Sequence, residues 1–434
     1  MNGQEIVANM KKLRQVKVTK EITQLTHAIF PGTHCPLMGA MMAVRGITDS
    51  VMLVVGTDEC TYYTKNTTIH NFSFGGLDGR CVSVVLDQHD VTFGSYDKIT
   101  EAFEELMEEY NPKAVFLVST CIVEIIGDDI DAMAEEYGDK YDIPVLAVHT
   151  EHFKTENHLP GVEDTITACF AMMEGQEKDN SVNIIGQRLG EFRSTELYTI
   201  LKDANVEMGM MLPSGCTTED IKKAPKAKVN IVVNPIGLPI AKKMERTYGI
   251  PYVLFDKYVN PQYIKETYEQ LFAYLNIVCP EKINQFYESA NNKKVEIGEK
   301  LKDLKYIYGN TPLQTFEFNA FMIEMGMIPQ LIQTAELPTT EDRNLNYILE
   351  NSDPYVTKTA NIAPLQYVYD ELKPNLYLGH EYAMRLKAKG IALVRSDKAS
   401  SMLGFEITEF ILTELLRAGE EAKELERSRK HESM

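Results

Sequence analysis

The stretch AVFLVSTCIVEIIGDDIDAMAEEYG (114–138), followed by PVLAVHT (144–150), determines the fold class. The stretch begins with an apolar, β-branched run of strand length. A segment follows whose apolar residues recur with helical spacing, and a second apolar run comes after that segment. Both runs lack polar alternation, which is typical of strands buried on both faces of a parallel sheet. The stretch therefore predicts a strand–helix–strand unit with a right-handed crossover.

The same alternation continues in both directions along the chain. Further apolar runs are VMLVVG (51–56), VNIIG (182–186), VNIVVN (229–234), YVLF (252–255) and IALV (391–394). Segments of helical period lie between them at 96–110, 240–249 and 263–275. Because the pattern restarts twice, we expect an α/β protein of three doubly wound, parallel-sheet, Rossmann-like domains.

Changes in composition suggest where the domains end. The polar segment EGQEKDNS (174–181) closes the first unit, and a helical connector at 279–304 leads into the third. We expect domains at 1–175, 176–280 and 281–434. The last includes an amphipathic helix at 404–416 and a charged tail, which we interpret as a solvated helix end or a disordered terminus.

The charge balance limits the classes of partner. The chain has 434 residues, with 44 Lys and Arg against 63 Asp and Glu, a formal net charge of −19. This acidity argues against nucleic acid or an anionic membrane as the main partner. No apolar run approaches the roughly 20 residues of a membrane span, and the N-terminus lacks the apolar core of a signal peptide. We expect a cytoplasmic protein.

Seven cysteines are spread along the chain, at 35, 60, 81, 121, 169, 216 and 279. An odd number at wide spacing does not fit a disulfide framework, which belongs to short secreted domains. In a reducing compartment these thiols are metal ligands, nucleophiles or buried apolar residues.

Three cysteines lie where a parallel sheet binds ligands. Cys121 directly follows a predicted strand and begins a helix, Cys60 comes four residues after a strand, and Cys35 lies in a Pro/Gly-rich loop before an apolar helix. Ligands gather outside the carboxyl ends of such strands, and a helix N-terminus stabilises a thiolate. Without a CxxC companion they do not suggest structural zinc. Each one taken alone is more often a buried core residue than a ligand, because free cysteine is among the most buried residue types.

The sequence motifs around these cysteines resemble those of a known family. FPGTHCPLMGA (30–40), GTDECTYY (56–63) and STCIVEIIGDDI (119–130) resemble the three cysteine motifs of the nitrogenase MoFe-protein-like (component 1) family. That family includes both MoFe-protein subunits, a cofactor-maturation scaffold, the dark-operative protochlorophyllide reductase and the nickel-sirohydrochlorin cyclase. The resemblance continues through TFGSYDKITEAFEELMEEYNPKAVFLVSTC (92–121) and later segments, and covers nearly the whole chain.

The resemblance implies a cofactor and partners. Cys35, Cys60 and Cys121 would be ligands of an iron–sulfur cluster at a subunit interface, either [4Fe–4S] or the P-cluster type [8Fe–7S]. Since three cysteines do not complete either cluster, a homo- or heterodimer, or a tetramer, is implied. The family's electron donor is a separate iron protein that hydrolyses ATP. In agreement, this chain has no GxxxxGK[ST] phosphate loop of its own.

The departures from the family are equally informative. Val233 stands about where a MoFe α-subunit carries its cofactor cysteine, and ALVRSDKASSMLGFE (392–406) lacks the cofactor histidine. Neither protein ligand of the iron–molybdenum cofactor is recognised. We interpret the chain as a subunit of the catalytic component of a nitrogenase-like, ATP-dependent reductase, an oxidoreductase that takes part in electron transfer. The alternatives are a scaffold for maturation of a complex iron–sulfur cofactor and a metal-free interaction subunit, and the substrate stays open.

Other chemistry-bearing residues have simpler interpretations. We expect Cys81, Cys169 and Cys279 in packing and Cys216 near a helix cap. HTEHFKTENH (149–158) is interpreted as a polar loop that follows a strand. Asp128, Asp129, His380 and Glu381 are expected at helix caps or on the surface.

Overall fold

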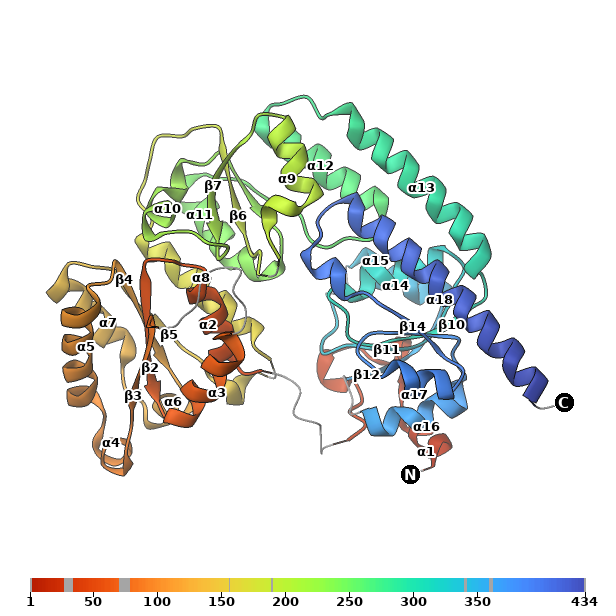
Figure 1. The fold of residues 1–434 in the computed structure, drawn as a ribbon, viewed down its shortest axis with the longest axis horizontal. Coiled ribbons are helices and arrows are strands. Elements are labelled where there is room, and N and C mark those ends of the chain that lie inside the picture. Colours follow the sequence, from red (N-terminus) through yellow and green to blue (C-terminus); the bar gives the residue numbers. More distant parts are fainter. Residues whose placement is uncertain are drawn as a thin grey trace.

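The computed structural model describes residues 2–26, 34–69, 79–155, 157–188, 190–338, 342–358 and 362–432. It contains three sheets, which follow one another along the chain except that a short N-terminal strand belongs to the third (Figure 1). Every pair of described strands is parallel except β1 (Lys11–Lys12) with β12 (Tyr355–Thr357). The predicted α/β class with parallel, Rossmann-like sheets is therefore confirmed.

The strand bounds are as follows. The first sheet has the order β3 (Cys81–Val85), β2 (Ser50–Gly56), β4 (Ala114–Ser119), β5 (Val145–Val148). The second has the order β7 (Glu207–Leu212), β6 (Ser181–Ile185), β8 (Val229–Val232), β9 (Tyr252–Leu254). The third has the order β1 (Lys11–Lys12), β12 (Tyr355–Thr357), β11 (Ile328–Gln333), β10 (Lys305–Tyr308), β13 (Leu376–Leu378), β14 (Ala392–Val394).

The helices occupy the connections. Those around the first sheet are α2 (Pro36–Arg45), α3 (Asp58–Ile69), α4 (Gln88–Phe93), α5 (Tyr96–Tyr110), α6 (Cys121–Ile126), α7 (Ile130–Tyr141) and α8 (Leu159–Ala168). Those of the second are α9 (Glu196–Asp203), α10 (Thr218–Lys223), α11 (Leu238–Tyr248) and α12 (Pro261–Leu275). The others are α1 (Gly3–Asn9), α13 (Glu281–Leu301), α14 (Thr315–Glu324), α15 (Arg343–Asn351), α16 (Ile362–Leu372), α17 (Ala383–Ala388) and α18 (Phe405–Glu432). No described helix is both long enough and apolar enough to span a bilayer.

The first sheet shows why its strands read as continuous apolar runs. Met52 and Val54 of β2 face one cluster, to which α2 and α8 contribute, while Val51 and Leu53 face a second cluster with α5 and α7. Successive side chains of a strand point to opposite faces, so a strand covered on both sides needs apolar residues at every position.

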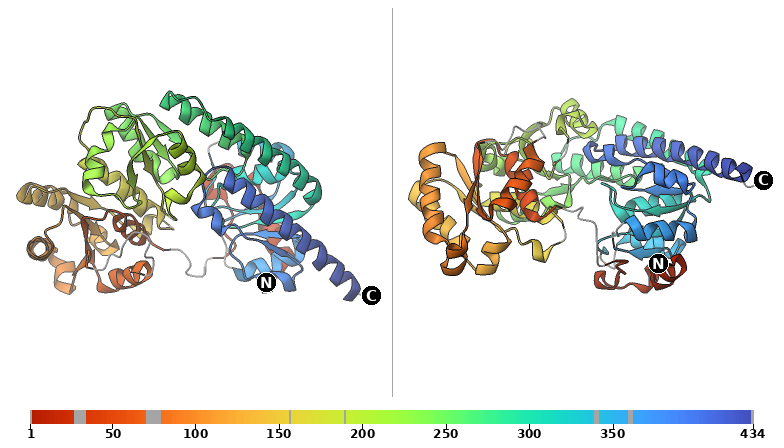
Figure 2. Two further views of the ribbon diagram at one scale, coloured as in Figure 1. Left: turned by 45° about the horizontal axis from the view of Figure 1, so that its top comes forward. Right: turned by 60° about the horizontal axis from the view of Figure 1, so that its bottom comes forward.

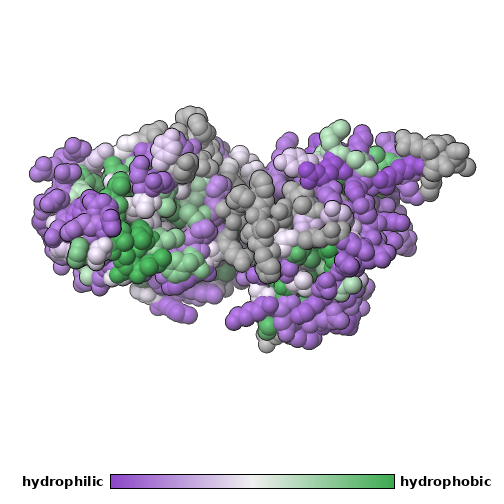
Figure 3. Space-filling view, turned by 90° about the horizontal axis from the view of Figure 1, so that it is seen from below, coloured by the Kyte–Doolittle hydropathy of each residue, from purple (hydrophilic) through white to green (hydrophobic). Residues whose placement is uncertain are grey.

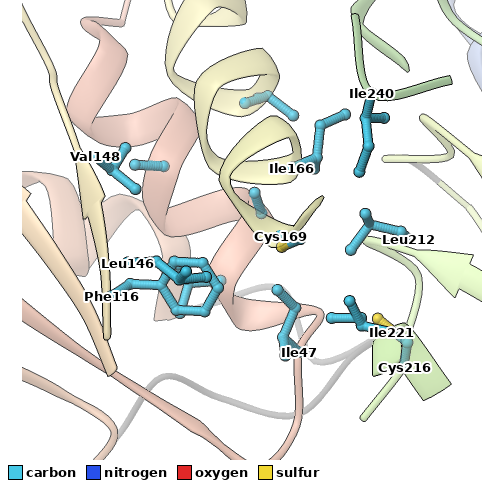
Figure 4. Packing of buried hydrophobic residues seen from close by; sticks show 14 of the residues in the cluster. Ile47, Phe116, Leu146, Val148, Ile166, Cys169, Leu212, Cys216, Ile221 and Ile240 are labelled. Atoms are coloured by element: carbon cyan, nitrogen blue, oxygen red, sulfur yellow. The ribbon is translucent and has the colours of Figure 1, made fainter. Parts of the chain in front are cut away.

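The first two sheets share one hydrophobic core. A single cluster joins Phe116 and Leu146 of the first sheet to Leu212 of the second, through Ile166 of α8 and Ile240 of α11. Figure 4 shows these side chains meeting around Cys169 and Cys216. The first two predicted domains, which meet near residue 175, therefore share one continuous hydrophobic core.

A long helix connects the second sheet to the third. The predicted connector at 279–304 is the helix α13, which packs along α18, and α18 continues through most of the charged tail. Two further views show α18 extending beyond the third sheet toward the C-terminus (Figure 2). The tail is thus a helix end, one of the two alternatives expected for it.

The N-terminal segment belongs to the third sheet, although the predicted boundaries placed it in the first domain. Lys11 and Lys12 of β1 pair antiparallel with β12, and α1 packs against α16. A two-residue edge strand of lysines has no apolar signature, and its partner lies more than 300 residues away in sequence. Lys and short length are usual features of edge strands.

Two carboxylates join the second sheet's helices to α18 by capping each other's helices. Glu196, the first residue of α9, accepts hydrogen bonds from the backbone N–H groups of Phe405 (3.0 Å) and Glu406 (3.1 Å). Glu406 in turn accepts from the N–H of Glu196 (3.1 Å) and of Leu403 (2.8 Å). The Tyr268 hydroxyl also donates to Glu196 (3.0 Å). The first turns of both helices are thereby satisfied reciprocally.

This junction predicts a pH dependence of stability. Burial raises the pKa of Glu196 from 4.5 to about 7. The folded chain therefore binds this proton more tightly than the unfolded chain, so this group's contribution to stability falls as pH rises between those values. Relative to Glu196→Gln, the unmodified protein should lose up to about 3 kcal/mol of unfolding free energy across that window. Urea denaturation over this pH range measures it.

Glu207→Gln is the matched control, because Glu207 begins β7 and is exposed. It should follow the unmodified protein at every pH. If the unfolding free energies of the unmodified protein and of Glu196→Gln changed with pH in parallel, the Glu196 carboxyl would not be the source of the pH dependence.

Candidate functional site

Each of the three candidate cysteines lies at the start of a helix. Cys35 is the N-cap of α2, Cys60 lies in the first turn of α3, and Cys121 is the first residue of α6. Cys60 is exposed, and Cys35 and Cys121 are half-buried. The first backbone N–H groups of a helix have no partner within the helix and can donate hydrogen bonds to a bound group.

The loops that carry Cys60 and Cys121 touch each other. They follow β2 and β4, which are neighbouring parallel strands, and the N–H of Thr120 donates to Val55 O (3.0 Å). A Cβ on Gly56 would lie 2.0 Å from Thr120 Oγ1, so only glycine permits this approach. These two cysteines therefore share the carboxyl edge of the first sheet, as predicted. Cys35 lies at the start of α2, which contacts α3.

A hydrogen-bonded network holds the Cys121 helix in place. His149, at the end of β5, contacts Glu124 of α6 through Nδ1 (2.8 Å) and Asp131 of α7 through Nε2 (3.0 Å). Burial alone would lower the pKa of His149, but the two carboxylates more than offset this and raise it. Ser119 also donates to Glu124. The loop after β5 thus fixes the helix on which Cys121 lies.

Two unpartnered hydroxyls stand next to the candidate cysteines. Thr61 Oγ1 and Thr120 Oγ1 are buried, and neither finds a hydrogen-bond partner within the described part of the chain. Buried hydroxyls are normally satisfied, and each unsatisfied one needs an explanation. Both oxygens are enclosed by protein and do not face open space, and Thr120 Oγ1 points toward Gly56. The fit to an inorganic cluster rests instead on the donor set, one exposed and two half-buried thiols at helix starts.

The remaining four cysteines are packed away from this edge. Cys81, Cys169 and Cys216 are buried, and Cys279 is half-buried against the core of the second sheet. Burial raises the pKa of Cys81 to about 11 and also raises the pKa values of Cys169, Cys216 and Cys279. Such thiols are poor ligands because the thiolate is disfavoured. Packing roles were expected for all of them except Cys216, which was expected near a helix cap. Cys216 does precede the N-cap residue Thr217, and it is also part of the hydrophobic core.

Within the described ranges, no three His, Cys, Asp or Glu side chains lie close enough to hold a single metal ion. A closed structural zinc site would need four such ligands. Three thiols at separate helix starts instead fit part of the ligand set of a larger cluster completed by a second chain. The assignment of Cys35, Cys60 and Cys121 as ligands stays a prediction.

Apolar side chains are exposed on the same domain. Val85 ends β3, Ile125 lies on α6 and Phe93 ends α4, and they are 44%, 69% and 77% exposed. Seen from below, apolar surface gathers on the part of the molecule formed by the first sheet and its helices (Figure 3). Exposed apolar surface of this kind marks interaction sites.

The other predicted candidates have structural roles. Asp129 caps α7 through the N–H of Ala132, and Asp128 accepts from Ser95. Glu381 lies before α17 and accepts from Tyr369 (3.3 Å) and from the N–H of Tyr382. His380 lies 3.7 Å from Asp397 at the surface. The 149–158 segment is more than a polar loop, because His149 positions α6 and His158 is the N-cap of α8.

The two positions that depart from the iron–molybdenum cofactor pattern offer no ligand. Val233 is 1% exposed and packs in the core of the second sheet. The segment between β14 and α18 forms a short 3₁₀ helix, Asp397–Ser401, without histidine.

The fold is that of solved nitrogenase structures. A structure titled "Nitrogenase Cp1 at pH 6.5" matches with a TM-score of 0.76 and 16% identity, covering 92% of this chain and 95% of that one. A second, "Nitrogenase Cp1 at pH 5", matches with a TM-score of 0.68 and 19% identity, covering 96% and 97%. At such identity the likeness establishes the architecture alone.

Sequence relatives define the family. The family described as "Nitrogenase component 1 type Oxidoreductase" matches residues 35–402. The chain therefore belongs to this family, as its cysteine motifs predicted. It is 32% identical to the nitrogenase iron-molybdenum cofactor biosynthesis protein NifE of Clostridium pasteurianum, over 50% of this chain and 49% of the relative. It is 27% identical to the nitrogenase molybdenum-iron protein alpha chain of the same organism, over 53% and 45%. The chain spans about half the length of these curated relatives.

Proposed function

We propose that the chain is a subunit of the catalytic component of a nitrogenase-like, ATP-dependent reductase. The observation that supports the proposal is that Cys35, Cys60 and Cys121 lie at three helix N-termini, with Cys60 and Cys121 at the carboxyl edge of the first sheet, in a chain of this family. The cluster, of the [4Fe–4S] or [8Fe–7S] type, would supply one-electron transfer when bound.

A second subunit of the same family, in a homo- or heterodimer or a tetramer, would complete the ligand set. The exposed apolar residues Val85, Phe93 and Ile125 support an interface on the domain that carries the cysteines. The electron donor would be a separate iron protein that hydrolyses ATP, since this chain has no phosphate loop.

The chain's own residues would position the thiolates. Glu124 and His149 hold α6, so that Cys121 keeps its place at the sheet edge. Gly56 lets the two cysteine-bearing loops approach each other. The substrate would bind where the three domains adjoin. The cysteine and histidine that hold the iron–molybdenum cofactor in the family are not recognised in this chain, and Val233, at about the cysteine position, offers no donor.

A scaffold for cofactor maturation is the second candidate. It is favoured by the relatives of the NifE type, which are named as cofactor biosynthesis proteins. The same three cysteines serve either function, so the cluster does not distinguish them.

Turnover distinguishes the two. We expect that the anaerobically purified protein, mixed with a nitrogenase-type iron protein and reductant, supports ATP hydrolysis with electron flow that depends on this chain. Hydrolysis without electron uptake, together with release of a metallocluster to an apo-acceptor protein, would support the scaffold and contradict the reductase. The protein in which Cys121 is replaced by alanine is the control for both assays, because it should fail in each.

A further inference from the structure

A cavity at the outer edge of the second sheet plays no part in the proposed function. Its volume is about 290 Å³, at the small end of ligand sites, which span roughly 300–1,000 Å³. Its described lining residues come from β9, from α12, from the loop between them and from the start of α15, and none of them lies within 1–175. The cavity is therefore separate from the sheet edge that carries the candidate cysteines.

One wall of the cavity is an open strand edge. β9 is the last described strand of the second sheet, and on its β8 side the N–H of Phe255 donates to Val232 O (2.7 Å). The peptide groups of successive strand residues point to opposite sides, so those of Tyr252 and Leu254 point away from β8. Tyr252 and Leu254 line the cavity, whereas Val253 between them does not. The backbone thus presents polar groups to the cavity that no described strand pairs.

These outward groups form a complementary pair. The carbonyl group of Tyr252 is an acceptor and the N–H group of Leu254 is a donor, and in a parallel sheet both would bond to one residue of a neighbouring strand. A flat heterocycle with an amino group beside a ring nitrogen, as in adenine, carries the matching donor and acceptor along one edge. Two outward residues are too few to hold an added strand, because strands usually have about 3–10 residues.

A second wall offers planar surfaces for stacking. Tyr263, in the first turn of α12, lies perpendicular to Tyr258, with an interplanar angle of 89° and ring centroids 6.0 Å apart. The guanidinium of Arg343, the first residue of α15, lies over the Tyr263 ring, with Cζ 3.4 Å from the centroid. The Tyr263 hydroxyl donates to Asn344 Oδ1 (2.8 Å), which ties α12 to α15. Heterocyclic bases stack on aromatic rings and on guanidinium planes of this kind.

The charges that line the cavity are already balanced. Glu266 and Arg343 are the only charged residues among its described lining, and Arg343 Nη2 lies 3.5 Å from Glu266 Oε2. The Arg343 side chain is 58% exposed, so the guanidinium face that is not on Tyr263 is open to a ligand. Because no unpaired cation or anion faces the space, the cavity favours a neutral ligand over a charged one.

We propose that this cavity binds a neutral, planar nitrogen heterocycle that carries an amino donor beside a ring-nitrogen acceptor, as an aminopurine nucleoside does. The edge of the heterocycle would bond to the backbone of Tyr252 and Leu254. Its ring would stack on the guanidinium plane of Arg343, which Tyr263 supports from the other side. Binding of this ligand requires neither iron nor the proposed function.

Isothermal titration calorimetry of the full chain with adenosine tests the site. We expect saturable binding of one adenosine per chain. The 6-dimethylamino analogue, which keeps the ring but lacks the amino donor, should bind at least tenfold more weakly (about 1.4 kcal/mol). ATP should bind no more tightly than adenosine, because the described lining offers phosphate no unpaired cation. Equal binding of adenosine and the dimethylamino analogue, or tenfold tighter binding of ATP, would contradict recognition of the heterocycle by its edge.

Two variants locate the binding. Arg343→Lys keeps the charge beside Glu266 but removes the plane, and Tyr263→Leu removes the ring beneath it, so each should weaken adenosine binding at least tenfold. Arg246→Lys, on the exposed side of α11, and Tyr274→Leu, which is 40% exposed farther along α12, are the matched controls and should bind like the unmodified protein.

Circular dichroism verifies that the four variants fold. Absence of saturable adenosine binding, or unchanged binding by either Arg343→Lys or Tyr263→Leu, would overturn the proposal. Those results would leave the cluster assignment intact, because no candidate cysteine lines this cavity. Conversely, a protein that bound no iron would still be expected to bind adenosine.

Discussion

Replacing Cys121 with alanine should remove most of the iron from the anaerobically purified protein. The thiolate is a direct ligand in our account, and loss of even an outer partner of a metal ligand costs about 10–100-fold in affinity. We expect iron and acid-labile sulfide per chain to fall at least about tenfold, together with the broad visible absorbance. Cys35→Ala and Cys60→Ala should have the same effect.

Cys279→Ala is the matched control for this experiment. Cys279 is half-buried against the core of the second sheet, away from the edge that carries the candidate ligands. It should keep the iron content of the unmodified protein. Full iron in Cys121→Ala, with circular dichroism unchanged, would show that the sulfur of Cys121 is not a ligand.

Gly39→Ala should destabilise the protein by about 3 kcal/mol, through overpacking in the core. A Cβ on Gly39 of α2 would lie 1.9 Å from the carbonyl oxygen of His158, and one on Gly161 of α8 would lie 1.9 Å from that of Pro36. Backbone atoms on both sides leave no flexible side chain to move, so α2 and α8 would separate. Gly161→Ala should therefore behave in the same way, and urea denaturation measures both.

Gly175→Ala is the control for the two glycine variants. Its Cβ would meet only Tyr248 Cε1, at 4.0 Å. Its unfolding free energy should stay within about 0.5 kcal/mol of the unmodified protein. If Gly39→Ala unfolded at the same urea concentration as Gly175→Ala, the close crossing of α2 and α8 would be wrong. Because α2 carries Cys35, we also expect Gly39→Ala to bind less iron.

Much of the first sheet was predictable because its strands are covered on both faces. The runs at 51–56 and 114–120 correspond to β2 and β4, and the helix at 96–110 is α5. The expected helix from Cys121 onward is in fact two helices. Gly127 adopts a left-handed conformation (φ 81°), which ends α6 and allows Asp129 to cap α7.

Strands of the third sheet were harder to predict. β10 consists of Lys305–Tyr308, and β11 contains Pro329 at a register shift, so neither forms a continuous aliphatic run. Tyr306 and Tyr308 of β10 pack in one cluster with residues of α14 and α18, which the local sequence does not reveal. The pairing of β1 with β12 is a contact across the whole chain, and no short-range pattern encodes it.

The candidate site was predictable only in part. The positions of Cys60 and Cys121 follow from the general rule that ligands bind at the carboxyl ends of parallel strands. The role of His149 was not recognised, since it looks like an ordinary residue of a polar loop after a strand. Only the fold brings its ring to Glu124 of α6 and Asp131 of α7.

Anomalous diffraction at the iron edge, from crystals of the anaerobically purified protein, tests the central claim most directly. The account predicts iron bonded to the sulfurs of Cys35, Cys60 and Cys121, at a contact between two subunits. Iron bound elsewhere, or these three sulfurs in separate apolar surroundings without iron, would contradict it.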